Sequence, residues 1–104
     1  MNFAHTIETR KNSLKKLLTN VIKYEDEIIK ALYNDFKKPA FEAVATETSY
    51  IISDLKDTIA TIDKYAKPQK VTFNLLNFPS NDYIISEPYG KVLIIAPWNY
   101  PFQL

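Results

Sequence analysis

The segment that most constrains the fold of this chain is a continuous apolar run at residues 91–96, which reads Lys-Val-Leu-Ile-Ile-Ala. Its β-branched residues predict a strand that is buried on both faces of a parallel sheet. Such a strand needs neighbouring strands on both sides and helices on both faces. The chain has 104 residues and offers one further strand candidate, at residues 83–86. We therefore expect it to be the N-terminal part of a longer α/β protein.

Three amphipathic helices are predicted before that segment. The first, at about residues 4–22, has an apolar stripe at spacings of three and four, formed by Leu14, Leu17, Leu18, Val21 and Ile22. The second, at about residues 24–36, has acidic residues in its first turn, where negative charge suits the helix dipole. The third, at about residues 40–66, repeats its apolar residues at the same helical spacings.

The pattern changes after Pro68, whose ring cannot continue a helical hydrogen-bond ladder. We divide the chain into a helical region at residues 1–68, a β arm or linker at 69–90, and the start of an incomplete parallel-sheet domain at 91–104. The short strand candidate at residues 83–86 lies in the arm. The expected fold class is mainly α within this chain and α/β in the longer protein.

Composition narrows the possible partners and location. Lys and Arg number 13 and Asp and Glu number 12, so the formal net charge of +1 gives no reason to expect nucleic acid or an anionic membrane as partner. The sequence has no apolar run of about 18 residues, the length that predicts a transmembrane helix. The first residues are polar and show no secretory signal, so we expect a cytoplasmic protein.

Three residue types that are absent or rare exclude further kinds of site from this chain. It has no cysteine, which excludes disulfides and thiolate metal sites, and its single histidine cannot form a His-rich metal site. It has one glycine, where an average usage of about 7% would give roughly seven. A Gly-rich phosphate-binding loop is therefore excluded, and the composition suits a helical segment.

The charged residues of the predicted helices have ordinary structural explanations. Glu42 and Glu47 are five positions apart, a poor spacing for one helix face, so we predict no paired acid/base site. Lys37 and Lys38 follow the second helix, where positive charge suits the C-terminal end of the dipole. The acidic residues 25–27 are expected to form a solvated first turn.

A family resemblance rests on residues 87–102, which read E-P-Y-G-K-V-L-I-I-A-P-W-N-Y-P-F. This string resembles the start of the cofactor-binding domain of aldehyde dehydrogenases, most of all the class 3 (fatty-aldehyde) branch. The similarity continues upstream through residues 31–38, residues 41–43 and Glu47, and covers nearly the whole chain. It implies a longer enzyme that oxidises an aldehyde to a carboxylic acid with NAD or NADP. Residues 91–104 would then be the first strand and the P-W-N-Y-P loop of an incomplete Rossmann-like, dinucleotide-binding domain.

The resemblance assigns a catalytic role to Asn99. In the family, the Asn of the P-W-N motif donates its side-chain amide N–H to the oxyanion that forms when a cysteine attacks the aldehyde. Asn99 matches that position. Without the family context, an Asn between a Trp and a Tyr-Pro pair is better explained as a turn residue.

The resemblance also assigns cofactor contacts to Ile95, Ala96, Pro97 and Trp98, which match the stretch that lies along the dinucleotide and contacts it mainly through its backbone. Other family members have Gly, Ile or Val at the position of Ala96, which puts a side-chain role there in doubt. The structural alternative is a buried strand for Ile95 and Ala96 and a core aromatic for Trp98.

Two tyrosines are candidates for substrate binding. Tyr100 resembles the residue that lines the substrate tunnel beside the catalytic Asn in class 3 members, and Tyr50 on the third predicted helix is similar to another tunnel residue. The alternative for both is packing in the core, because an aromatic at helical spacing is commonly a core residue.

The remaining parts of the family's catalytic machinery lie downstream of the P-W-N-Y-P motif. They are the Cys nucleophile, the Glu general base, the pyrophosphate-binding helix N-terminus and the Lys and Glu residues that hold the ribose. We therefore expect the 104 residues alone to be inactive.

A second hypothesis is a standalone helical module that serves assembly without catalysis. An exposed apolar strand at residues 91–96 argues against it, because natural proteins avoid such edges. On either hypothesis, uncovered apolar faces should make the isolated chain self-associate, and the family resemblance implies a homo-oligomeric parent enzyme.

Overall fold

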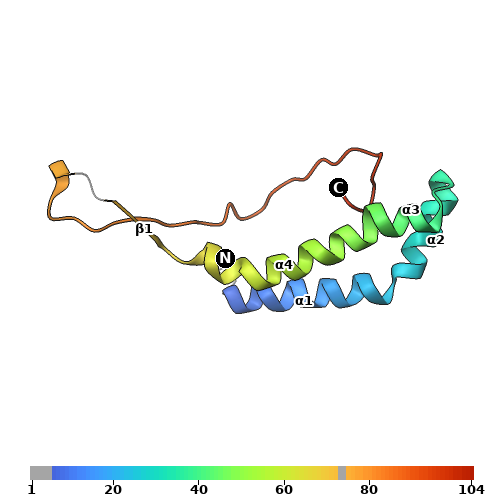
Figure 1. Ribbon diagram of the computed structural model, residues 1–104, viewed down its shortest axis with the longest axis horizontal. Coiled ribbons are helices and arrows are strands. Elements are labelled where there is room, and N and C mark those ends of the chain that lie inside the picture. The colour runs from blue at the N-terminus through green and yellow to red at the C-terminus, as the bar shows by residue number, and fades with distance from the viewer. Residues whose placement is uncertain (1–5, 73–74) are drawn as a thin grey trace.

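The computed structural model describes residues 6–72 and 75–104. As predicted, the described chain is mainly helical, and it ends in a small β arm and a long segment without regular structure (Figure 1). The first two helices are α1 (Ile7–Lys23) and α2 (Glu25–Phe36). The third predicted helix is a continuous helical path, built from α3 (Ala40–Ala43), a π-helical turn η1 (Val44–Thr48) and α4 (Ser49–Ala66).

Local capping sets the ends of the first two helices. Thr6 precedes α1, and its hydroxyl oxygen accepts a hydrogen bond from the backbone N–H of Thr9 at 3.2 Å, which satisfies one of the free donors of the first turn. Helix α2 ends at Phe36 because Lys37 adopts the left-handed conformation, with φ of 56°. The predicted start of the first helix, at residue 4, lies outside the described residues.

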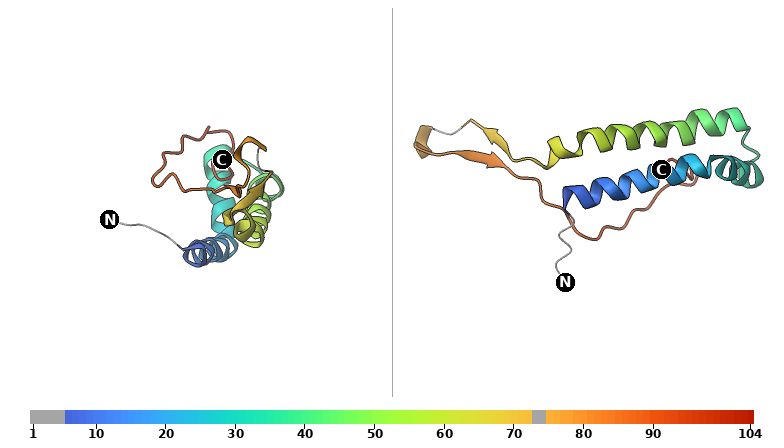
Figure 2. Two further views of the ribbon diagram at one scale, coloured as in Figure 1. Left: turned by 90° about the vertical axis from the view of Figure 1, so that its left-hand side faces the viewer. Right: turned by 90° about the horizontal axis from the view of Figure 1, so that it is seen from below.

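The helical core lies between α1 and α4, which run side by side in Figure 1 and in the right-hand view of Figure 2. Val21 of α1 and Leu55 and Ile62 of α4 are buried there. Other residues of the predicted α1 stripe are only partly covered, since Leu17 and Ile22 are 49% and 51% exposed. A single partner helix cannot cover a wide apolar stripe, so part of it faces solvent.

The arm is an antiparallel hairpin that projects beyond the helices (Figure 1). β1 (Gln69–Val71) pairs with β2 (Asp82–Ile84), and Lys70 lies opposite Tyr83. The short 3₁₀ helix η2 (Leu75–Asn77) lies between them in sequence. The strand predicted at residues 83–86 is confirmed with bounds one or two residues earlier, whereas β1 was not predicted because Gln-Lys-Val has no clear apolar alternation. The arm lengthens the molecule to 63 × 27 × 25 Å.

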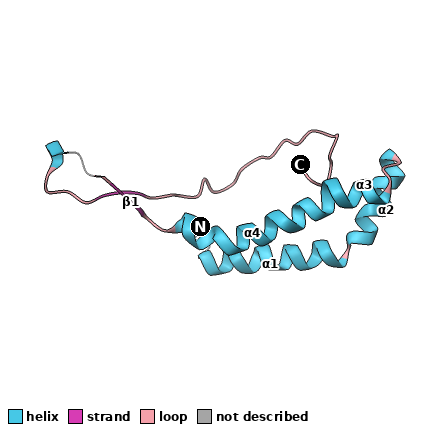
Figure 3. Cartoon of the chain, viewed as in Figure 1, coloured by secondary structure: helices cyan, strands magenta, loops and turns pink. Residues whose placement is uncertain are grey.

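The strand predicted at residues 91–96 does not form in this structure, so that prediction is wrong for the isolated chain. The segment has no regular secondary structure (Figure 3), and Ile94 and Ile95 are 78% and 87% exposed. A strand is stabilised by hydrogen bonds to a neighbouring strand, and within the described residues the only paired strands are β1 and β2. The apolar pattern alone therefore cannot produce the element.

The buried face of α4 should dominate the stability of the chain. We expect Leu55→Ala to lower the free energy of unfolding by about 2–4 kcal/mol, because it removes buried methyl groups and leaves a cavity. Leu93→Ala is the matched control: the side chain is 85% exposed, so the same change should cost less than about 0.5 kcal/mol. Urea unfolding followed by circular dichroism measures both, and equal losses would contradict the assigned core.

Candidate functional site

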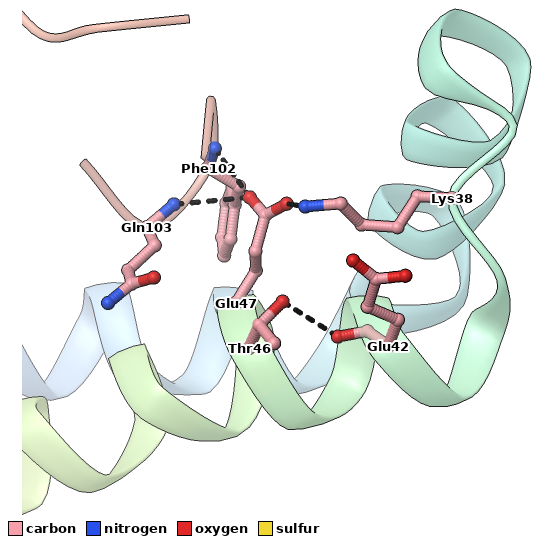
Figure 4. A network of polar contacts seen from close by, with 6 residues as sticks. All are labelled: Lys38, Glu42, Thr46, Glu47, Phe102 and Gln103. Carbon is pink, nitrogen blue, oxygen red and sulfur yellow. Dashed lines mark hydrogen bonds and ion pairs between the residues drawn. The ribbon is translucent and has the colours of Figure 1, made fainter. Parts of the chain in front are cut away.

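The segment that carries the P-W-N-Y-P motif ends in a turn that docks on the helices. Residues 101–103 form the turn, and the backbone N–H of Leu104 donates to the carbonyl oxygen of Tyr100 at 3.0 Å. Phe102 and Gln103 reach the helical path between α3 and α4 (Figure 4). This contact joins the last residues of the chain to a helix more than fifty positions earlier in sequence.

Glu47 of η1 is the centre of the contact. One carboxylate oxygen, Oε2, accepts hydrogen bonds from the backbone N–H groups of Phe102 at 2.8 Å and Gln103 at 3.3 Å. The other oxygen, Oε1, pairs with the ammonium of Lys38 (Figure 4). Glu47 is 0% exposed. A buried carboxylate is costly unless it is paired and hydrogen-bonded, and here both of its oxygens have donors.

Lys38 links the same carboxylate to the motif itself. Lys38 is 8% exposed. Its Nζ lies 4.6 Å from the centre of the Tyr100 ring, within the range of a cation–π contact. The left-handed Lys37 ends α2 immediately before it and turns the chain toward η1. The end of α2 thus supplies the positive charge of the site.

The π-helical turn that carries Glu47 is also bonded to α2 through the next residue, Thr48. The hydroxyl of Thr48 donates to Oε1 of Glu25 at 2.6 Å, and Thr48 is 0% exposed. Single π-helical turns inside α-helices are rare and frequently occur at functional sites. Glu25, expected to be a solvated residue of a first turn, is therefore half-buried and tied to this turn.

The predicted catalytic and cofactor residues lie just before the docked turn. Asn99 is exposed, and so are Ile95, Ala96, Pro97 and Trp98, with Trp98 79% exposed. None of these side chains lies in the core of this chain. Ile95 and Ala96 are therefore not in a buried strand here, and Trp98 is not a core aromatic. Their proposed roles stay predictions.

The two tyrosines predicted to bind substrate are both close in sequence to residues of the Glu47 contact. Tyr100 is half-buried under Lys38, and Tyr50 is 58% exposed one helical turn after Glu47. The docking of the turn therefore brings the motif to the region of α4 that carries Tyr50.

Sequence reasoning missed the pairing of Glu47 with Lys38. The spacing of Glu42 and Glu47 says nothing about this contact, because the partners of Glu47 are a lysine outside its helix and two backbone N–H groups. One signal was available in the sequence: Glu47 shares a helical face with the apolar positions Val44 and Ile51. A charge on an apolar stripe indicates a buried ion pair, but it does not name the partner.

The part of the chain that the structure describes contains neither a candidate metal site nor a membrane-spanning helix. Residues 6–72 and 75–104 contain no group of three His, Cys, Asp or Glu side chains that could hold a metal ion. No helix among the described residues is both long enough and apolar enough to cross a membrane.

Comparison with known proteins identifies the class. The family profile described as "Aldehyde dehydrogenase family" matches residues 3–104. The chain therefore belongs to the aldehyde dehydrogenase family, as the P-W-N-Y-P motif predicted.

Individual relatives agree with the class 3 resemblance. The chain is 45% identical over 98 residues to 4,4'-diaponeurosporen-aldehyde dehydrogenase of Staphylococcus aureus, which covers 94% of this chain and 21% of that protein. It is 38% identical over 97 residues to aldehyde dehydrogenase family 3 member H1 of Arabidopsis thaliana, covering 93% and 20%. The solved structure titled "Substrate bound state of Staphylococcus Aureus AldH" superposes with a TM-score of 0.90 at 44% identity, covering 94% and 21%. The chain spans about a fifth of these relatives.

The buried pair should show strong energetic coupling. We expect the double-mutant cycle of Lys38→Met and Glu47→Gln to give a coupling of roughly 1–3 kcal/mol, because each single change leaves the other charge buried without its partner. The control cycle is Lys11→Met with Asp63→Asn, an ion pair between α1 and α4 whose side chains are 28% and 47% exposed. Solvent weakens that pair, so its coupling should be below about 1 kcal/mol. Urea unfolding measures both cycles, and similar couplings would contradict the special role of burial.

Proposed function

We propose that the protein to which this chain belongs oxidises an aldehyde to a carboxylic acid with NAD or NADP. The observation that carries the proposal is the family match over residues 3–104, which includes the whole motif around Asn99. In this proposal the chain contributes the helical region, the arm, and one catalytic residue with its flanking loop. The alternative of a standalone interaction module is not favoured by a match to an enzyme family along the entire chain.

Asn99 is the proposed oxyanion donor. When a nucleophile adds to the aldehyde carbon, the carbonyl oxygen becomes negatively charged, and a side-chain amide N–H aimed at it lowers the barrier. The exposed position of Asn99 leaves its amide free to reach a substrate. The chain has no cysteine, so the nucleophile of the family would come from outside these residues.

Residues 95–98 are the proposed contact with the cofactor. NAD or NADP, when bound, accepts the hydride that leaves the aldehyde carbon. The segment fits this group because residues 95–98 are exposed in this chain, Trp98 by 79%, so they are accessible to a dinucleotide. Tyr100 and Tyr50 are proposed to contact the aldehyde from the docked turn and from α4.

Apolar surface supports a proposed oligomer. Leu75 and Leu76 in the arm and Leu93 and Ile95 in the following segment are each more than 80% exposed. Apolar surfaces of this kind commonly mark contacts with other protein surfaces. We infer self-association of the isolated chain from all four residues, and a homo-oligomeric parent enzyme from the two exposed leucines of the arm.

Substitution of Asn99 should slow the chemical step. The experiment uses a chimera in which this chain replaces the matched 98 residues of the S. aureus relative. Asn99→Ala should lower kcat by about 100- to 1000-fold, because one oxyanion donor is lost. Reduction of the nicotinamide cofactor with a panel of aldehydes gives the rates.

The matched control for this experiment is Asn81→Ala, an exposed asparagine of the arm that should leave kcat unchanged. A folded chimera without dehydrogenase activity would contradict the proposed function. An active chimera in which Asn99→Ala loses less than about tenfold would contradict the oxyanion role.

The 104-residue chain by itself should reduce neither NAD nor NADP in the presence of an aldehyde, even at high protein concentration. It lacks a cysteine nucleophile, and its single glycine cannot form a phosphate-binding loop. Titration calorimetry should also show no micromolar binding of either cofactor. Aldehyde-dependent cofactor reduction by the purified chain, or a micromolar dissociation constant, would show that the prediction is wrong.

A further inference from the structure

The buried Glu47 has no part in the chemistry proposed above, yet it receives the backbone of the catalytic loop. We propose that Glu47, together with Lys38, is a positioning residue that holds the loop so that the amide of Asn99 is aimed at the developing oxyanion. The inference rests on the proposed function. Neither residue touches substrate or cofactor in it; both act through Asn99.

The first step of the argument is that docking of the turn and burial of Glu47 depend on each other. Lys38 pairs with only one carboxylate oxygen, Oε1. The other oxygen, Oε2, receives the N–H groups of Phe102 and Gln103. If the turn detached, Oε2 would lose both donors in a site where Glu47 is 0% exposed. An unsatisfied charged oxygen is costly, so the carboxylate keeps the turn in place.

The second step is that Asn99 lies between residues that contact the helices, on its C-terminal side, and exposed residues, on its N-terminal side. On its C-terminal side, Tyr100 lies 4.6 Å from the Lys38 ammonium, and Phe102 is bonded to Glu47. On its N-terminal side, Trp98 is 79% exposed. Asn99 is thus the first residue outside the anchored stretch. Its amide direction depends on where Tyr100 is held.

The third step is that the platform under the turn is itself fixed. Thr48 follows Glu47 in the π-helical turn and donates to Glu25 of α2 at 2.6 Å. Lys38 directly follows Lys37, the C-cap of α2. Glu47 is therefore held by two elements, and Figure 4 shows its carboxylate between the lysine and the turn. A support of this kind matters, because a displacement of about 1 Å can reduce a rate about 100-fold.

The test uses the same chimeric enzyme. Glu47→Gln removes the charge while keeping the side-chain shape, and it should lower kcat about 10- to 100-fold. Glu47→Asp keeps the charge for Lys38 but draws the acceptor back from the turn, so it should give a smaller loss with less effect on folding. The control is Glu42→Gln, an exposed carboxylate on the same helical path, which should leave kcat unchanged.

The decisive comparison is made in the Asn99→Ala background. If Glu47 acts through Asn99, Glu47→Gln should cause no further loss of kcat there, because effects of residues that act as a unit are not additive. A merely structural defect would multiply with the loss caused by Asn99→Ala. Full multiplication of the two losses, or an unchanged kcat in Glu47→Gln with Asn99 present, would overturn the inference. An Asn99→Ala variant as active as the parent chimera would instead refute the oxyanion role of Asn99, and a folded chimera without dehydrogenase activity would refute the proposed function.

A second readout needs no activity. Trp98 is the single tryptophan of the chain and adjoins Asn99, so its fluorescence anisotropy reports whether the loop is held. In the 104-residue chain, Glu47→Gln and Glu47→Asp should lower the anisotropy while the helical circular dichroism signal is kept, and Glu42→Gln should change neither. Unchanged anisotropy in both Glu47 variants would overturn the inference.

Discussion

A carboxylate removed from water must find its donors inside the protein, and the arrangement of this chain depends on how Glu47 finds them. Its donors are the ammonium of Lys38 and two consecutive N–H groups of the last turn. These three contacts join the end of α2, the π-helical turn and the C-terminal residues at one point (Figure 4). Without them, the segment after β2 would have no polar attachment of this kind to the helices.

The apolar side chains of this chain are less completely buried than the Glu47 carboxylate. α1 and α4 bury one seam, but Leu17 and Ile22 stay about half exposed, and the segment at residues 92–95 lies in solvent. The radius of gyration is 19.3 Å, whereas a compact domain of about 100 residues has a radius of about 13 Å. Uncovered apolar surface and an elongated shape fit a chain that spans about a fifth of the relatives it matches.

The predicted elements differ in how well they survive in the isolated chain, and the reason is the range of the interactions that form them. A helix makes its hydrogen bonds within a few residues, so the periodicity at residues 24–36 was enough to place α2 with its end at Phe36. A strand makes its hydrogen bonds to another segment. The run at residues 91–96 has a clear strand pattern and no partner among the described residues, so it stays extended and exposed.

The features of the candidate site also differ in whether they depend on consecutive residues or on contacts between distant segments. The sequence by itself determined the family and the motif around Asn99, because those are properties of consecutive residues such as Pro97, Trp98 and Tyr100. It also determined that Glu47 lies on an apolar helical face. Only the tertiary structure decided what that charge meets: a lysine nine positions earlier and a turn 55 and 56 positions later. Burial selects such partners by geometry across the folded chain, and no local pattern encodes that geometry.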